Sequence, residues 1–156
     1  MKRFSPLYGI LLVLAFTAAV LGAEYAMHGH DRDFVRVAPE KNGLLQLQVG
    51  DLGPNQVRFY RFLNSGNQEV KFFVGRDGAG NLQVAYDAAE SDYKRKRGFR
   101  HQGEWLVNNK CETAIRLKDV ASGRGGCAPV PLKYSLAGTS LTLTESDILD
   151  GWRYFR

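Results

Sequence analysis

The stretch YDAAESDYKRKRGFRHQGEWLVNNKCETAIRLKDVASGRGGCAPVP, residues 86–131, contains both cysteines of the chain, Cys111 and Cys127. Short apolar runs alternate here with polar, glycine-rich segments. Such segments let the backbone turn tightly beside side chains that can ligate or cross-link. This pattern is typical of loops that form a site, and the rest of the chain is expected to be the framework that positions them.

Upstream of this stretch the sequence has the alternation of antiparallel β-strands. Leu45, Leu47 and Val49 alternate with glutamines, which gives one apolar and one polar face. A loop at 77–81, which contains Asp-Gly, predicts a β-hairpin. Three runs rich in aromatic and β-branched residues are expected as further strands, at 57–63, 70–74 and 82–86.

Downstream, strands are expected at 105–107 and 140–144, and a brief helical turn at 147–149 that ends at Gly151. Residues 114–120 fit either a short strand or one helical turn. The predicted fold class is therefore mostly β, that is α+β with minor helix. We expect an antiparallel meander or a small β-barrel-like domain whose site lies on loops.

The N-terminus has the layout of a secretory signal or a signal anchor. Lys2 and Arg3 precede an uncharged apolar run at 7–23. Bulky residues stand where a cleavage site needs small ones, which favours a retained anchor over a cleaved signal, with the following domain outside the cytoplasm. The predicted organisation is a signal anchor or signal peptide at 1–23, a linker at 24–43 and one domain at 44–156.

The charge distribution argues against a nucleic-acid partner, because a formal net charge of +5 is only a mild excess for an exported chain. The densest basic run, at 94–97 with Arg100 behind it, is interpreted as a solvated loop. Docking to an acidic partner or to anionic lipid is the alternative. Residues 27–31, Met-His-Gly-His-Asp, are interpreted as a polar spacer, with copper or another late transition metal as the alternative.

Enzyme signatures are absent from the sequence. It contains no Gly-x-Ser-x-Gly, His-Glu-x-x-His, phosphate-binding loop or Cys-x-x-Cys. Ser91 and Ser122 have no histidine near them along the chain, so a hydrolytic enzyme is disfavoured. We therefore expect a protein that is not an enzyme.

An ordered set of motifs between residues 57 and 155 resembles a known family, the FtrD-like membrane iron–sulfur domain. This bacterial family is found beside ferrous-iron uptake systems and related membrane redox modules. The resemblance therefore implies a protein of the bacterial inner membrane, with its domain facing the periplasm. The matching positions are 72–74, 84–88, Tyr93, 98–103, 125–127, Pro129, Pro131, Asp147, Gly151, Tyr154 and Phe155.

The departures from the family pattern fall on the cysteines. Where the family has Cys-x-x-Cys, this chain has Ala-Glu-Ser-Asp at 89–92, and Cys-Asn-Asn-Cys is replaced by Asn-Asn-Lys-Cys at 108–111. Only Cys111 and Cys127 fall on family cysteine positions. An iron–sulfur cluster needs four thiolates, or two thiolates and two imidazoles. The family implies iron–sulfur or another metal, but we expect no such cofactor in this member.

Three interpretations remain open for Cys111 and Cys127. A structural disulfide is favoured, because the compartment outside the cytoplasm is oxidising. In the chain-entropy model such a cross-link contributes about 3 kcal/mol. A reversible redox pair is the second interpretation. The third is a metal site built from Cys111, Cys127, Asp92 and His101.

The carboxylates of Asp87, Glu90 and Asp92 lie at or beside the replaced cysteine positions. Oxygen ligands suit a harder ion such as ferrous iron or manganese. The favoured interpretation is that Asp87 caps a turn, while the other two are solvated or paired with the basic run at 94–97.

The resemblance implies an accessory role beside a bacterial iron-transport or membrane redox system. The expected partners are the membrane, through the N-terminal helix, and an iron permease or a membrane redox protein. This member is expected to keep the scaffold and a docking surface while being degenerate for iron–sulfur binding. The alternative is a redox or metal-binding protein that uses Cys111 and Cys127.

Overall fold

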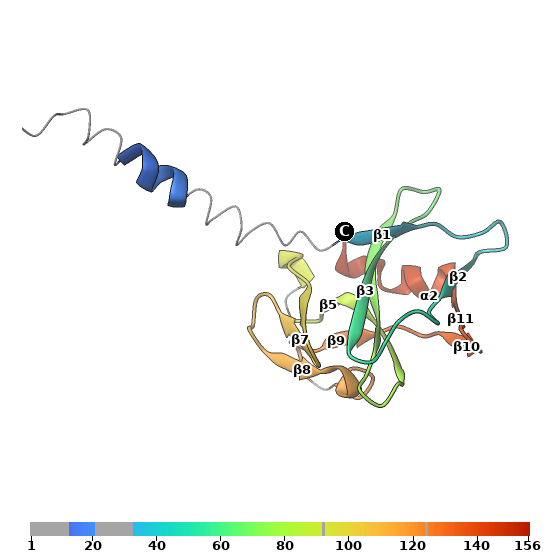
Figure 1. Cartoon of the computed structure of the whole chain (residues 1–156). Helices are drawn as coiled ribbons and strands as arrows, with labels where there is room; N and C mark the ends of the chain where they lie inside the picture. Colours follow the sequence, from blue (N-terminus) through green and yellow to red (C-terminus); the bar gives the residue numbers. More distant parts are fainter. Residues whose placement is uncertain (1–12, 21–32, 92, 124) are drawn as a thin grey trace, which may run out of the picture. The chain divides into compact units, whose positions relative to one another are not determined.

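The computed structural model describes residues 13–20, 33–91, 93–123 and 125–156 (Figure 1). The chain divides into two units, Met1–Arg32 and Asp33–Arg156. In the first unit, residues 13–20 form a helix. Within the described ranges, no helix combines the length and the apolar character that a bilayer crossing requires. The metal-binding alternative at 27–31 lies outside these ranges.

The second unit is built on a five-stranded sheet in the order β1-β3-β4-β5-β9. Strand β1 pairs parallel with β3, and the other neighbours pair antiparallel. The meander β3-β4-β5 confirms the predicted hairpin at 77–81 and the predicted antiparallel meander. The bounds are β1 Phe34–Val37, β3 Gln56–Leu63, β4 Glu69–Arg76, β5 Leu82–Ala89 and β9 Pro129–Pro131.

Two three-stranded antiparallel sheets complete the unit, in the orders β10-β11-β2 and β6-β7-β8 (Figure 1). The bounds of the first are β2 Leu44–Gln48, β10 Ser135–Ala137 and β11 Ser140–Thr144. Those of the second are β6 Phe99–Gln102, β7 Trp105–Asn108 and β8 Ala114–Arg116.

Four short helical segments connect or end these strands: 3-10 turns η1 Tyr93–Arg95, η2 Leu117–Asp119 and η3 Trp152–Tyr154, and helix α2 Glu145–Asp150. Helix α2 begins after Thr144, whose side-chain oxygen accepts a hydrogen bond from Asp147 N, and ends at Gly151. The predicted helical turn is thus present. The ambiguous segment 114–120 contains both predicted alternatives, because β8 is followed directly by η2.

The two faces of the central sheet bury separate hydrophobic clusters. One cluster joins Phe62 and Phe72 to Leu141 of β11 and Ile148 of α2. The other joins Phe59, Phe73 and Ala85 to Phe99, Leu106 and Leu117, which belong to β6, β7 and η2. Each small sheet therefore covers one face of the large one. All eight residues of β5 are buried, which explains why its sequence is almost continuously apolar.

The mostly β class with minor helix is confirmed. Over residues 33–91, 93–123 and 125–156 the sheets do not close into a barrel, because separate small sheets cover the two faces of an open central sheet. Strand β1 lies inside the segment that was expected to be a linker. It joins the sheet edge through Phe34, whose ring packs on Phe59 at a centroid distance of 5.8 Å.

Candidate functional site

Three segments that are far apart in the sequence meet at a disulfide bond between Cys111 and Cys127. The Sγ–Sγ distance is 2.09 Å and the Cα–Cα distance is 6.4 Å. Cys111 follows β7, Cys127 precedes β9, and both are half-buried. The third segment is the end of β5 with the turn that follows it. These are the segments in which the family pattern has its cysteines.

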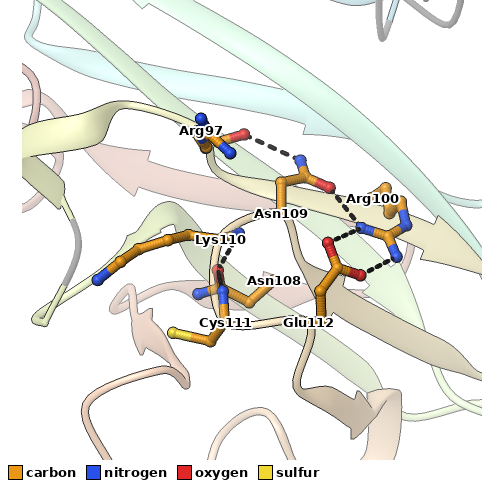
Figure 2. Close-up of polar contacts among 7 residues, drawn as sticks. All are labelled: Arg97, Arg100, Asn108, Asn109, Lys110, Cys111 and Glu112. Atoms are coloured by element: carbon orange, nitrogen blue, oxygen red, sulfur yellow. Dashed lines mark hydrogen bonds and ion pairs between the residues drawn. The ribbon is translucent and has the colours of Figure 1, made fainter.

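Asn108 binds both cysteine-bearing segments. Its side chain is buried at the end of β7, where Oδ1 accepts hydrogen bonds from Lys110 N at 2.8 Å and Cys111 N at 3.1 Å (Figure 2). Its Nδ2 donates to Cys127 O at 3.1 Å. The sequence identified this position only as a replaced cysteine. The run Asn-Asn-Lys-Cys after a strand is, however, a signal for an asparagine that caps its own turn.

Ser91 fixes the third segment against the second cysteine. Its backbone N and its Oγ donate to the same carbonyl, Gly126 O, at 2.9 Å and 2.5 Å. Its Oγ also lies 3.6 Å from Cys127 Sγ. A Cβ on Gly126 would come within 2.8 Å of Ser91 Cβ, so the close approach requires glycine. Ser91 was predicted only as a serine without a nearby histidine.

The replaced cysteine position Ala89 and the predicted site residue His101 lie in different environments. Ala89 is buried in β5 beside Pro129, and its methyl group offers no ligand atom. Asp92 lies outside the described residues. His101 is in β6, where its Nε2 lies 2.6 Å from Gly103 O. In the part of the chain that the structure describes, no three His, Cys, Asp or Glu side chains are grouped so that they could hold a metal ion.

Asp87 connects β5 to the start of β6. Its side chain is buried, and Oδ1 accepts a hydrogen bond from Phe99 N at 2.7 Å. Gly98 has a φ of +59°, and a Cβ there would overlap the Asp87 carboxylate. Glu90, in contrast, is exposed. The Asp87 side chain therefore fixes the backbone at the start of β6, directly after the basic segment 94–97.

A second set of polar contacts holds the segments on either side of Gly98 and Cys111 together (Figure 2). Asn109 donates from its backbone N to Gly98 O at 3.0 Å and from Nδ2 to Arg97 O at 2.9 Å. Arg100 donates to Asn109 Oδ1 at 3.0 Å and to Glu112 Oε2 at 2.6 Å. The hydrogen bond from Arg100 lowers the pKa of Glu112 below its ordinary value.

The serines do not form a nucleophile–histidine pair in the described contacts. Ser91 bonds Gly126 O, and Ser122 Oγ donates to Asp119 O at 3.3 Å. His101 bonds Gly103 O instead. The geometry therefore shows a cross-linked junction of loops.

Fold and site together define a mostly β domain in which three cysteine-pattern segments meet at one junction. The sequence profile of the family described as "Membrane iron-sulfur containing protein FtrD-like" matches residues 52–155, more than half of the chain. The chain belongs to this family. No curated protein and no solved structure matches it.

The donor atoms at this junction do not fit an iron–sulfur cluster. Cys111 and Cys127 are bonded to each other, so neither offers a thiolate. At two further positions where the family pattern has cysteine, Ala89 has no ligand atom and the Asn108 oxygen already accepts two backbone hydrogen bonds. A cluster requires four such ligands. No chemistry that depends on a cluster follows from these residues.

Proposed function

We propose that this chain is an exported, membrane-tethered FtrD-like protein, an accessory to a bacterial iron-transport or membrane redox system, in which the cluster-ligating site has become a structural cross-link. One observation carries the proposal. Cys111 and Cys127 are joined to each other, and Asn108 and Ser91 bond the backbone around them. A junction held in this way is rigid without a metal centre.

Three considerations support this proposed location. The family description names a membrane protein. The apolar run at 7–23 behind Lys2 and Arg3 supplies a tether with the domain outside the cytoplasm. A disulfide persists in that oxidising compartment and is rare in the cytosol. The protein acts there without catalysis, and presents its surface to an iron permease or a membrane redox partner.

The deciding experiment is metal analysis, acid-labile sulfide analysis and visible spectroscopy on protein purified without reductant or chelator. We expect a colourless protein, no stoichiometric iron or sulfide, and no free thiol in the denatured, unreduced chain. The same metal analysis on the Cys111→Ser/Cys127→Ser variant measures how much metal binds without the two sulfurs. A brown preparation with sulfide in proportion to protein, absent from the variant, would contradict the proposal.

A redox role for the same cysteines is the second candidate. Both are half-buried, and the Ser91 hydroxyl lies 3.6 Å from Cys127 Sγ, so it could donate to a thiolate there by giving up its hydrogen bond to Gly126 O. A protein dithiol would supply the two electrons. One of its thiolates attacks a sulfur of the disulfide, its second thiol resolves the mixed disulfide, and both cysteines leave as thiols while the dithiol is oxidised. The reduced pair would then be available to a thiophilic metal.

Redox titration separates the two candidates. A structural disulfide resists reduction in the folded protein, with a potential below about −300 mV, whereas thioredoxin-like pairs titrate near about −270 mV. We expect the Cys111–Cys127 disulfide to resist reduction in the folded protein. Reversible reduction of the native protein near about −270 mV would favour the redox role.

A further inference from the structure

Five cationic side chains gather on two adjoining loops beside the disulfide. Four follow one another on and after η1, and the fifth lies on the loop between β7 and β8. All five are exposed. We call this set the basic surface; it consists of Lys94, Arg95, Lys96, Arg97 and Lys110.

The backbone of the basic surface is held by contacts that leave the charged ends of its lysines unused. Asn109 bonds Gly98 O and Arg97 O, which ties the two loops together. Lys96 N donates to Tyr93 O at 2.9 Å, and the Tyr93 ring packs edge-on against Tyr154 at 5.5 Å. Figure 2 shows the Lys110 side chain extending away from the hydrogen-bonded group around Asn109. Hydrogen bonds and ring packing therefore hold the backbone that carries these charges.

Four of the five cations of this surface form no ion pair with a carboxylate in the described part of the chain. These four are Lys94, Arg95, Lys96 and Lys110. Glu112, the acidic residue on the second loop, is paired with Arg100 at 2.6 Å. Elsewhere, Arg58 and Arg116 are paired with Asp51 and Asp119. These four cations lie close together and have no ion-pair partner among the described residues, and such a concentration of charge attracts a partner of the opposite sign.

We propose that the basic surface docks on the anionic phospholipid headgroups of the membrane that tethers the chain. This inference rests on the proposed tether. Residues 24–33, between the apolar run and β1, span at most about 35 Å when fully extended, so the domain stays near the bilayer surface. Lysine and arginine residues that are held within about a Debye length of a membrane surface are attracted to its anionic headgroups.

The small size of the hollow beside the basic surface favours lipid over an acidic peptide as the partner. The adjoining hollow, lined by Tyr93, Lys96 and Arg97 among others, has a volume of about 110 Å³. Ligand pockets are usually at least about 300 Å³. Attraction between a charged surface and a layer of headgroups needs no pocket, so anionic lipid is the better match.

The test is lysine acetylation of the full chain on vesicles, read by mass spectrometry. On vesicles that contain phosphatidylglycerol at low salt, we expect several-fold slower acetylation of Lys94, Lys96 and Lys110 than on neutral phosphatidylcholine vesicles. The difference should disappear at high salt, because salt screens the attraction. The exposed Lys41 and Lys118 serve as internal references and should react equally on both.

Paired charge-reversal variants sharpen the test. Lys94→Glu/Lys96→Glu should abolish the protection of Lys110, and Lys41→Glu/Lys118→Glu, with the same change in net charge, should leave it intact. Equal acetylation of wild-type Lys94, Lys96 and Lys110 on anionic and neutral vesicles would overturn the proposal, even if a variant failed to fold. Protection on native membranes that is lost on vesicles of their extracted lipids would also overturn it, in favour of an acidic protein partner.

A separate experiment tests the proposed tether. A tethered chain cosediments with neutral vesicles at high salt, where the basic surface makes no contribution. If it does not, the tether is contradicted. Binding of the same chain to anionic vesicles at low salt, with protection of the three lysines, would still support the lipid-docking surface.

Discussion

At the scale of single residues, Asn108 has the most contacts to lose at the junction. Asn108→Ala would leave Lys110 N, Cys111 N and Cys127 O without their partner in a partly buried environment. Since each unsatisfied buried group costs about 1–3 kcal/mol, we expect the oxidised protein to lose about 3 kcal/mol of unfolding free energy. Urea unfolding measures this loss.

Asn42→Ala is the control for this prediction, because Asn42 is exposed and its Oδ1 accepts a single hydrogen bond, from Leu44 N at 3.0 Å. It should cost about 1 kcal/mol or less. If the two alanine variants were equally stable, the junction would not depend on Asn108.

Gly98 provides a second test, with a matched control. Its φ of +59° disfavours any side chain, and a Cβ would also overlap the Asp87 carboxylate. Gly103 has a φ of +60° with no heavy atom within 4 Å of the added Cβ. Gly103→Ala should therefore show only the backbone cost of about 1–2 kcal/mol. Gly98→Ala should cost about 1–3 kcal/mol more, because the Asp87–Phe99 contact must shift.

Thermal or urea unfolding of both glycine variants provides the measurement. Equal losses would mean that Asp87 moves freely, and that its contact with Phe99 N does not fix the start of β6.

Sequence reasoning located the two cysteines of the junction but missed the residues that support them. Ser91 and Asn108 are separated along the chain from Cys127, which each of them contacts. These contacts arise only when three loops are brought together by the packing of two sheets. Local turn chemistry predicts that an asparagine bonds its own loop. Local turn chemistry contains no information about Cys127, which lies nineteen positions from Asn108 along the chain.

At the scale of elements, strands that alternate or carry aromatic runs could be predicted, and strands with unusual composition could not. β9 contains Pro129 and Pro131, and proline cannot donate to a sheet ladder. It is nevertheless the edge partner of β5, which continues to Ala89 rather than ending at Tyr86. Likewise β1 is an edge strand with exposed central residues, so its sequence resembles a linker.

The hairpin loop between β4 and β5 predicts a dependence of stability on pH. Asp77 Oδ1 accepts hydrogen bonds from Ala79 N at 3.0 Å and Asn81 N at 2.8 Å. Burial raises the pKa of Asp77, but the hydrogen bonds from Asn81 and Ala79 outweigh it, so the pKa lies below its ordinary value. The unfolded chain therefore binds the proton more tightly than the folded one.

The Asp77 carboxylate thus contributes its full stability above the unfolded pKa of about 3.9, and this contribution is lost as the pH falls through the lower folded pKa. Asp77→Asn keeps an oxygen acceptor but cannot titrate. We expect its stability to fall less steeply than that of the wild type below about pH 4. Melting temperatures measured across the acid range test this, and parallel curves would contradict the assigned role of Asp77.

At the scale of the whole molecule, the disulfide joins two segments whose surrounding core is already formed. The second hydrophobic cluster, with Phe73, Phe99 and Leu106 fully buried, supports β6 and β7 without the sulfurs. The mostly β class follows from sequence patterns alone, since alternation and turn residues are local signals. The stacking of two small sheets on opposite faces of a third does not, because it depends on contacts between distant strands.

This arrangement makes a final prediction for Cys111→Ser/Cys127→Ser. The cross-link spans a sequence separation of 16, for which the chain-entropy model gives about 3 kcal/mol of stabilisation. We expect the variant to lose about that much unfolding free energy while its circular dichroism stays native, because the cores do not use the sulfurs. Wild-type protein unfolded in the presence of reductant should give the same value, since both lack only the cross-link. A variant that could not fold, or that folded with undiminished stability, would contradict the view that the disulfide replaces a metal centre as the brace of this junction.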